Sequence, residues 1–184
     1  PTAVLSDLAA GLDTDGNPAW RERFERAEAR YWDLVEDACD EEYFEGAVLH
    51  DVAAHSPDPT TLFVSNSMPV RDLDRFGRPR TAALSTHGNR GVSGIDGVTS
   101  TALGAGSATD DPLVLVTGDI AYYHDMNGLL ALGRCGVDAT IVLVNNDGGG
   151  IFHILPIEAF EPPFTEQFKT PHGIDFEATE DLYD

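Results

Sequence analysis

Two continuous apolar runs dominate the second half of the chain, over residues 113–117 and 139–144. Unbroken runs of this length are typical of strands that are buried on both faces of a parallel sheet. The segment between them, 122–133, is predicted to be the helix that connects the two strands. Shorter apolar runs at 62–65 and 81–85 predict two more strands. The pattern therefore predicts an α/β fold with a doubly wound, mostly parallel sheet and helices on both faces.

The first third of the chain has the spacing of helices instead. Apolar residues recur every three or four positions after Asn17 and Pro18, which suit the cap and the first residue of a helix. These apolar residues are Trp20, Phe24, Ala27, Tyr31, Leu34 and Ala38. A second helix over 43–55 is predicted to end before the sequence Ser-Pro-Asp-Pro. We therefore predict a helical lead-in from a preceding domain over residues 1–56 and an α/β domain over residues 57–184.

Two other segments of this α/β domain are also predicted to be helices. Residues 97–107 are mostly Gly, Ala, Ser and Thr, which predicts a helix that packs unusually close to its neighbour. A last helix is predicted to begin near Asp175 and to run toward Asp184.

Polar residues follow both long apolar runs where each predicted strand ends. Gly118 and Asp119 follow the first run, and the sequence Asn-Asn-Asp-Gly-Gly at 145–149 follows the second. In open α/β sheets, ligands bind outside the carboxyl ends of the strands. Carboxylate and amide oxygens suit Mg2+ that carries a phosphate, and the glycines let the backbone approach that phosphate closely. Asp119 and Asn146 are therefore predicted to be metal ligands at this edge of the sheet.

The helix expected after Asp119 would direct the backbone amides of Ile120 and Ala121 toward the same place. An alternative interpretation is that Gly-Asp and Asn-Asn are two ordinary turns. Their separation along the chain suits a strand end, a connecting helix and a second strand, which favours a shared site. The chain contains no Gly-x4-Gly-Lys sequence, which argues against a nucleoside triphosphatase of the P-loop type.

The two polar elements together resemble the thiamine diphosphate motif, in which Gly-Asp-Gly is followed by Asn-Asn. Ile120 replaces the third residue of the opening element. Three segments narrow the family, LFVSNSMPVR at 62–71, NRGVSGIDG at 89–97 and NNDGGGIF at 145–152. They resemble the C-terminal, diphosphate-binding domain of the 2-succinyl-5-enolpyruvyl-6-hydroxy-3-cyclohexene-1-carboxylate synthase family, over about residues 61–184. Domains of that family continue further, so we expect this one to be truncated at its C-terminus.

The resemblance implies a cofactor, thiamine diphosphate, and a metal ion, Mg2+ or Mn2+. The metal ligands would be Asp119, Asn146 and the backbone carbonyl of Gly148. The side chain of Ile95 and the carbonyl of Gly94 would hold the cofactor in its bent form. The implied cofactor-binding residues are Gly94, Ile95, Gly118, Asp119, Ile120, Ala121, Asn146, Gly148, Gly149, Ile151 and Phe152.

The resemblance also implies residues that bind substrate. Arg71 and Arg90 are expected to bind substrate carboxylates, because a guanidinium presents a planar fork that matches two carboxylate oxygens. Ser67 belongs with them, and Leu155 is expected to extend an apolar wall. His124 and His153 fall on no position of the family motifs, so neither is predicted to be catalytic.

For the complete enzyme, the resemblance implies decarboxylation of 2-oxoglutarate and addition of the succinyl unit to isochorismate, in menaquinone biosynthesis. The glutamate that activates the cofactor is expected in the pyrimidine-binding domain of a partner subunit, within a homo-oligomer such as a dimer. No catalytic residue is therefore expected in this chain, which alone should be inactive. Two alternatives remain, another thiamine-dependent enzyme such as a decarboxylase or an acetolactate synthase type, and a non-catalytic doubly wound interaction domain.

The composition restricts the partners of the protein. The chain has 32 acidic against 11 basic residues and a formal net charge of −21, which argues against binding to nucleic acid or to anionic membranes. The acidic residues are spread along the chain, which favours adaptation to a salt-rich cytoplasm over the alternative, a basic partner. We found no apolar run long enough to span a membrane and no signal peptide, so a cytoplasmic location is expected.

Overall fold

The computed structural model describes residues 2–12 and 16–183, and the chain forms two compact units, residues 1–42 and 43–184. The first unit consists of helices α1 (Thr2–Gly11) and α2 (Pro18–Glu41). Asn17 caps α2, since its side-chain oxygen accepts a hydrogen bond from the amide of Trp20 at 3.1 Å. The predicted long helix, its cap and its first residue are therefore confirmed. Predictions for residues 1, 13–15 and 184 lie outside the described residues.

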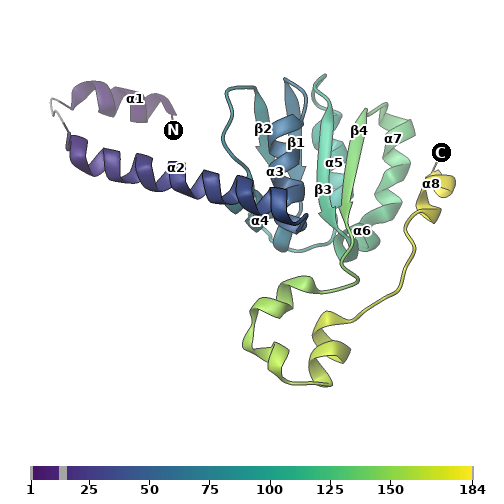
Figure 1. The fold of residues 1–184 in the computed structure, drawn as a ribbon. Coiled ribbons are helices and arrows are strands. Elements are labelled where there is room, and N and C mark those ends of the chain that lie inside the picture. Colours follow the sequence, from purple (N-terminus) through teal and green to yellow (C-terminus); the bar gives the residue numbers. More distant parts are fainter. Residues whose placement is uncertain (1, 13–15, 184) are drawn as a thin grey trace. The chain divides into compact units, whose positions relative to one another are not determined.

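The second unit contains a four-stranded parallel sheet (Figure 1). Its strands are β1 (Thr60–Val64), β2 (Leu84–His87), β3 (Leu113–Gly118) and β4 (Ala139–Val144), in the order β2-β1-β3-β4. All three neighbouring pairs are parallel, and β1 and β3 are buried along almost their whole length. This confirms the predicted parallel α/β sheet. The second strand begins three residues later than predicted, at the exposed edge of the sheet where the apolar pattern is weak.

Helices cover both faces of the sheet, as predicted for a doubly wound fold. Helices α3 (Glu45–His55) and α4 (Met68–Phe76) cover one face, where Leu49 packs with Leu62 and Val114. Helices α5 (Val98–Gly106), α6 (Asp119–Asp125) and α7 (Leu130–Cys135) cover the other face. There, Phe63 and Leu115 pack against Leu103 and Ala121. Alternate residues of β1 and β3 therefore enter two separate apolar cores.

The predicted connecting helix over 122–133 is interrupted. Helix α6 passes into a short 3-10 turn, Met126–Leu129, before α7 begins. At this turn a side chain on Gly128 would lie 2.6 Å from the hydroxyl of Ser100, so the backbone of the turn approaches α5 closely. The carboxylate of Asp125 also accepts hydrogen bonds from the amide and hydroxyl of Ser100, at 2.6 and 2.9 Å. The small residues of α5 thus permit the close packing that the sequence predicted.

Helix α3 belongs to the same compact unit as the sheet, which begins at Tyr43. The predicted domain boundary lies later, between residues 56 and 57, after this helix. The physical reason for the difference is the apolar face of α3, since Leu49 is fully buried in the core below the sheet. The rings of Phe44 and Phe76 also stack edge to face, which joins the start of α3 to the end of α4. Because α3 packs on the sheet, its first residue, Glu45, lies near the carboxyl ends of the strands.

After β4 the chain forms a lobe of short turns, defined here as residues 145–175 (Figure 1, green to yellow). It contains Gly150–Ile154, Pro156–Ala159 and the π-helical turn Thr165–Lys169. The predicted last helix is α8 (Ala178–Tyr183), which starts slightly later than expected. In the described part of the chain, no helix combines the length and the apolar character needed to cross a bilayer.

Candidate cofactor and metal site

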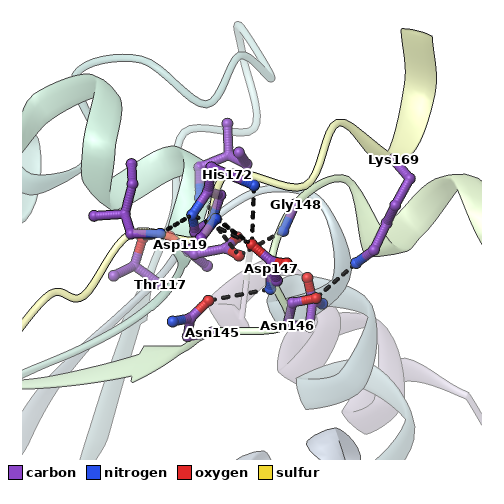
Figure 2. A network of polar contacts seen from close by, with 12 residues as sticks. Thr117, Asp119, Asn145, Asn146, Asp147, Gly148, Lys169 and His172 are labelled. Atoms are coloured by element: carbon purple, nitrogen blue, oxygen red, sulfur yellow. Dashed lines mark hydrogen bonds and ion pairs between the residues drawn. The ribbon is translucent and has the colours of Figure 1, made fainter. Parts of the chain in front are cut away.

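Asp119 begins α6 directly after β3, at the carboxyl edge of the sheet, and the residue is only 3% exposed. Its Oδ2 accepts hydrogen bonds from the amide of Gly148 at 2.8 Å and from Nε2 of His172 at 3.0 Å (Figure 2). Its Oδ1 accepts from the amide of Ile120 at 2.7 Å. The Ile120 amide, expected to face a diphosphate, therefore binds the carboxylate here. The segments that follow β3 and β4 therefore meet at the carboxylate of Asp119, as expected for two parallel strands that end at the same edge of the sheet.

Asn146 lies beside this carboxylate, and its side chain is held on one side only. The amide nitrogen Nδ2 donates to Oε1 of Glu45, at the start of α3, at 2.8 Å. The amide oxygen Oδ1 is buried and has no hydrogen-bond partner. The backbone oxygen of Asn146 accepts from Nζ of Lys169 at 2.6 Å, as Figure 2 shows. Lys169 is the only lysine of the chain.

The turn that follows Asn146 requires glycine. Gly148 has a φ of 125°, and a side chain there would collide with the backbone oxygen of Lys169. That same oxygen accepts a hydrogen bond from the amide of Gly149 at 2.7 Å. The glycine turn and the π-helical turn of the lobe therefore pack backbone against backbone. A side chain on Gly149 would likewise collide with the backbone oxygen of Phe168, so this packing explains both glycines structurally, apart from any approach to a phosphate.

The end of the lobe returns to the same place through Asp147 and His172. Oδ1 of Asp147 accepts from the amides of His172 and Gly173 at 2.9 and 2.8 Å, and these backbone hydrogen bonds lower the pKa of Asp147. Nδ1 of His172 accepts from the amide of Ile174 at 3.0 Å, so Nε2 carries the hydrogen that is donated to Asp119. No sequence signal pointed to His172, because its partners lie far away along the chain.

A cavity of about 210 Å³ opens at this edge, far more than the ~10–15 Å³ that one water needs. All of the predicted cofactor-binding residues except Gly94 line it. Ser67 is the only predicted substrate-binding residue in the lining, and Leu155 lies outside it with 45% of its surface exposed. The lining also includes residues that the sequence analysis missed, among them Glu45, Asn66, Met68, Pro69, Phe168 and Thr170.

Asn66 connects the loop that carries Gly94 and Ile95 to the end of β1. Its Nδ2 donates to the carbonyl oxygens of Gly94 at 2.6 Å and Asn89 at 3.2 Å, and its Oδ1 accepts from Arg90 at 2.7 Å. Asn66 is almost fully buried, so these contacts fix the loop firmly. The sequence did contain a signal for this residue, since a polar side chain directly after a buried strand is what identified Asp119.

The two predicted substrate arginines do not line the cavity, but each donates a hydrogen bond to a residue that does, Arg71 to Ser67 and Arg90 to Asn66. Nη1 of Arg71 donates to the backbone oxygen of Ser67 at 2.5 Å, and Ser67 has an unusual positive φ of 71°. Behind them, Asp72 is buried on α4. Burial, and next the negative charge of Glu45, raise the pKa of Asp72 to about 6, while Arg75 and Arg71 act in the opposite direction.

The oxygen atoms at this edge fit a hard divalent cation. The buried Oδ1 of Asn146 lacks a partner, and Asp119 and Gly148 line the same cavity, where the carbonyl of Gly148 accepts a hydrogen bond from the amide of Gly150 at 2.9 Å. Mg2+ prefers such oxygen ligands and usually completes its shell with phosphate and water. Among the residues described, no group of three or more His, Cys, Asp or Glu side chains is placed to hold a metal ion. A cation here would depend on the asparagine and on backbone oxygen.

Comparison with known proteins decides the family. Residues 65–181 match the family described as thiamine pyrophosphate enzyme, C-terminal TPP binding domain. The chain belongs to this family. Thiamine pyrophosphate is the same compound as thiamine diphosphate, so the family is the one that the motif at Asp119 and Asn146 indicated. The matched region begins at the end of β1 and contains the whole lining of the cavity except Glu45.

Relatives of this TPP binding domain carry a more specific name. The chain is 69% identical, over 98% of its length, to the 2-succinyl-5-enolpyruvyl-6-hydroxy-3-cyclohexene-1-carboxylate synthase of Haloarcula marismortui. It is 62% identical, over its full length, to the enzyme of the same name from Halobacterium salinarum. The chain spans only 30–31% of the length of these two relatives.

A solved structure shares the fold of the TPP binding domain at low identity. The benzoylformate decarboxylase from Polynucleobacter necessarius superposes with a TM-score of 0.59 and 20% identity. The superposition covers 76% of this chain and 27% of that one. This similarity concerns the fold alone, and it agrees with the parallel sheet described above.

Proposed function

We propose that this chain is the diphosphate- and metal-binding domain of a thiamine diphosphate-dependent 2-succinyl-5-enolpyruvyl-6-hydroxy-3-cyclohexene-1-carboxylate synthase. The complete enzyme, a transferase of menaquinone biosynthesis, decarboxylates 2-oxoglutarate and adds the succinyl unit to isochorismate. The observation that carries the proposal is the unpartnered, buried Oδ1 of Asn146 beside the carboxylate of Asp119, in a glycine-lined cavity. The names of relatives at 62–69% identity support the specific activity.

The Asp119 carboxylate, Oδ1 of Asn146 and the carbonyl of Gly148 would hold the metal, Mg2+ or Mn2+. Gly118, Ile120, Ala121 and Gly149, which line the cavity, would enclose the diphosphate. When bound, thiamine diphosphate supplies the reactive carbon and accepts electrons in the decarboxylation. The protein supplies position, because Asp119 is fixed by donors from three segments before any ligand arrives. Such preorganisation avoids the cost of arranging the site during the reaction.

Apolar side chains shape the rest of the cavity. Ile95 would support the bend of the cofactor, and Ile151 and Phe152, which also line the cavity, would exclude water from it. The ring of Phe168 packs edge to face against the ring of Phe152, with 5.5 Å between the ring centres. This contact within the lobe stabilises the apolar wall. The carbonyl of Gly94 would accept a hydrogen bond from the pyrimidine amine of the cofactor, and Asn66 already holds that carbonyl in place.

Arg71 and Arg90 would bind the carboxylates of 2-oxoglutarate and isochorismate, together with Ser67 and Leu155. Their guanidinium groups are tethered by one hydrogen bond each, to Ser67 and to Asn66, which leaves other N–H groups for a carboxylate. A tethered arginine loses less conformational entropy when it binds than a mobile one. The arginines thus select substrates by charge, while the cofactor is held elsewhere.

The catalytic glutamate belongs to the pyrimidine-binding domain of a partner subunit, so the working enzyme is a homo-oligomer such as a dimer. This chain alone holds half of a site and has no turnover. The excess of acidic residues suits a halophilic, cytoplasmic protein, a proposal that the halophilic sources of the relatives support.

The proposal is tested by titrating the complete enzyme with thiamine diphosphate at fixed Mg2+ and then measuring turnover of 2-oxoglutarate and isochorismate together. Asp119→Ala should weaken cofactor binding severely. His124→Ala, an exposed residue at the opposite end of the same helix, serves as the control and should bind normally. Unchanged cofactor binding by Asp119→Ala would refute the proposed site.

A further inference from the structure

Glu45 lies in the cavity but outside the region that matches the thiamine pyrophosphate family. It begins α3, and its Oε1 lies 2.8 Å from Nδ2 of Asn146, although the two residues are 101 positions apart. The proposed ligand Asn146 is therefore contacted by an acidic group from an element that the sequence analysis assigned to the lead-in.

Only one orientation of the Asn146 amide allows a hydrogen bond to Glu45. A carboxylate offers only acceptor oxygens, whereas the asparagine amide has two donor hydrogens on Nδ2 and an acceptor at Oδ1. If the amide were rotated by half a turn, Oδ1 would face the carboxylate and both groups would be acceptors. Glu45 thus holds the amide in the orientation that leaves Oδ1 free, and that oxygen is the buried atom without a partner.

Other groups hold the rest of Asn146 but do not choose between its two amide atoms. Lys169 binds the backbone oxygen. The backbone of Gly150 lies so close to the amide that any side chain there would collide with Nδ2. These contacts fix the position of the amide plane, and Glu45 alone among its hydrogen-bond partners distinguishes nitrogen from oxygen.

We propose that Glu45 is a positioning residue that orients the Asn146 amide, so that Oδ1 rather than Nδ2 faces the metal. The inference rests on the proposed function, because it needs Asn146 to be a metal ligand. It goes beyond the motif, since it assigns a role in metal binding to the helix that precedes the matched family domain. Residues that orient a metal ligand typically change metal affinity by 10- to 100-fold when they are removed.

The test measures Mn2+ binding to the complete enzyme with thiamine diphosphate present, by the electron paramagnetic resonance signal of free Mn2+. Glu45→Met keeps the length of the side chain but removes the acceptor, and it should weaken Mn2+ binding about 10- to 100-fold. Glu45→Gln offers both a donor and an acceptor, so it no longer excludes the rotated amide, and it should weaken Mn2+ binding by less than Glu45→Met does. Asp51→Ala removes an exposed carboxylate from the same helix and should leave Mn2+ binding unchanged. Should Glu45→Met fail to fold, Glu45→Ala provides the same comparison.

A second experiment, in the Asn146→Asp variant, separates the effect of amide orientation from the effect of the negative charge of Glu45. In Asn146→Asp the side chain has two equivalent oxygens, so it has no orientation to fix. Adding Glu45→Met to Asn146→Asp should then cause no further loss of Mn2+ affinity. An equal loss in both backgrounds, or normal Mn2+ binding by Glu45→Met alone, would overturn the inference.

Failure of the proposed function gives a different result. If wild type binds no Mn2+, or if Asp119→Ala binds it as well as wild type does, the proposed metal site itself is wrong and the inference falls with it. If Asp119→Ala loses Mn2+ and Glu45→Met does not, only the role of Glu45 is wrong.

Discussion

Nε2 of His172 lies 3.0 Å from Oδ2 of Asp119, although 53 positions separate the two residues along the chain. Both side chains are largely buried, and the other ring nitrogen of His172 is occupied by the amide of Ile174. The contact therefore ties the end of the lobe to the start of α6 through a charged acceptor.

The first prediction concerns this contact. His172→Ala should lower the free energy of unfolding by about 1.5–3 kcal/mol, because a buried carboxylate loses a charge-assisted hydrogen bond. Chemical denaturation of the chain measures the change. His172→Gln can place an N–H near the same oxygen and should recover part of the loss, while the exposed His124→Ala should have little effect. Equal stability of His172→Ala and wild type would show that the contact contributes nothing.

The second prediction concerns the glycine turn. Gly148→Ala should destabilise the fold by more than about 1 kcal/mol, because φ is positive and the new side chain meets the backbone oxygen of Lys169. Gly133→Ala, in helix α7 with open space around it, should be neutral or stabilising by about 0.5–1 kcal/mol. Thermal unfolding of both variants provides the comparison, and limited proteolysis of Gly148→Ala should cut first within residues 145–175.

The third prediction is a pH dependence that originates at Asp72. Its pKa in the folded state is raised from 3.8 to about 6, so the folded state binds this proton more tightly than the unfolded state does. The resulting stability is fully present below pH 3.8 and is lost as the pH rises through about 6.

Asp72→Asn should therefore be more stable than wild type at pH 7.5, by on the order of 1–2 kcal/mol after allowance for solvent screening, and the difference should shrink toward pH 5. Urea denaturation at a series of pH values measures it. Asp74→Asn, an exposed position of the same helix, is the control. A constant difference between Asp72→Asn and wild type across this range would contradict the assignment.

The fourth prediction concerns salt. With a formal net charge of −21, the folded chain repels itself at low ionic strength, and salt near one molar screens most of that repulsion. The midpoint of thermal unfolding should therefore rise clearly between low salt and molar KCl. A flat profile would argue against adaptation to a salt-rich cytoplasm.

The fifth prediction divides the site into two functions. Arg71→Ala and Arg90→Ala, built into the complete enzyme, should lower kcat/KM for the two substrates about ten- to hundredfold, since each loses a charge-assisted contact of roughly 1.5–3 kcal/mol. Cofactor affinity should remain near wild type, whereas Asp119→Ala should lose it. If the arginine variants lose cofactor affinity as severely as Asp119→Ala, the division is wrong.

The sequence predicted those parts of the fold that depend on local pattern. The apolar runs located β3 and β4, and the residues directly after them located Asp119 and Asn146, because a buried parallel strand delivers its next residues to one edge. Strand β2 was misplaced by three residues, since this edge strand is largely exposed and has little apolar pattern. The connecting helix was predicted without its break, because the close approach of Gly128 to Ser100 depends on tertiary packing.

Contacts that return from distant segments were not predictable. Glu45, Lys169 and His172 reach the site only because α3 packs under the sheet and the lobe folds back across its edge. Single residues of these types carry no local signal, so periodicity and motifs do not identify them. Asn66 differs from these three, because it follows a buried strand directly and the reasoning used for Asp119 applies to it.

Contributions to the site come from both ends of the second unit, from Glu45 at the start of α3 and from His172 near the end of the lobe. Contacts of such high sequence separation form late, after most of the chain entropy has been lost. A nascent or partly unfolded domain therefore lacks the assembled edge, and a cation or diphosphate that binds there as proposed would stabilise only the finished fold by mass action. In the cell, cofactor supply would then act as a selection step that protects completed molecules and leaves incomplete ones to proteolysis.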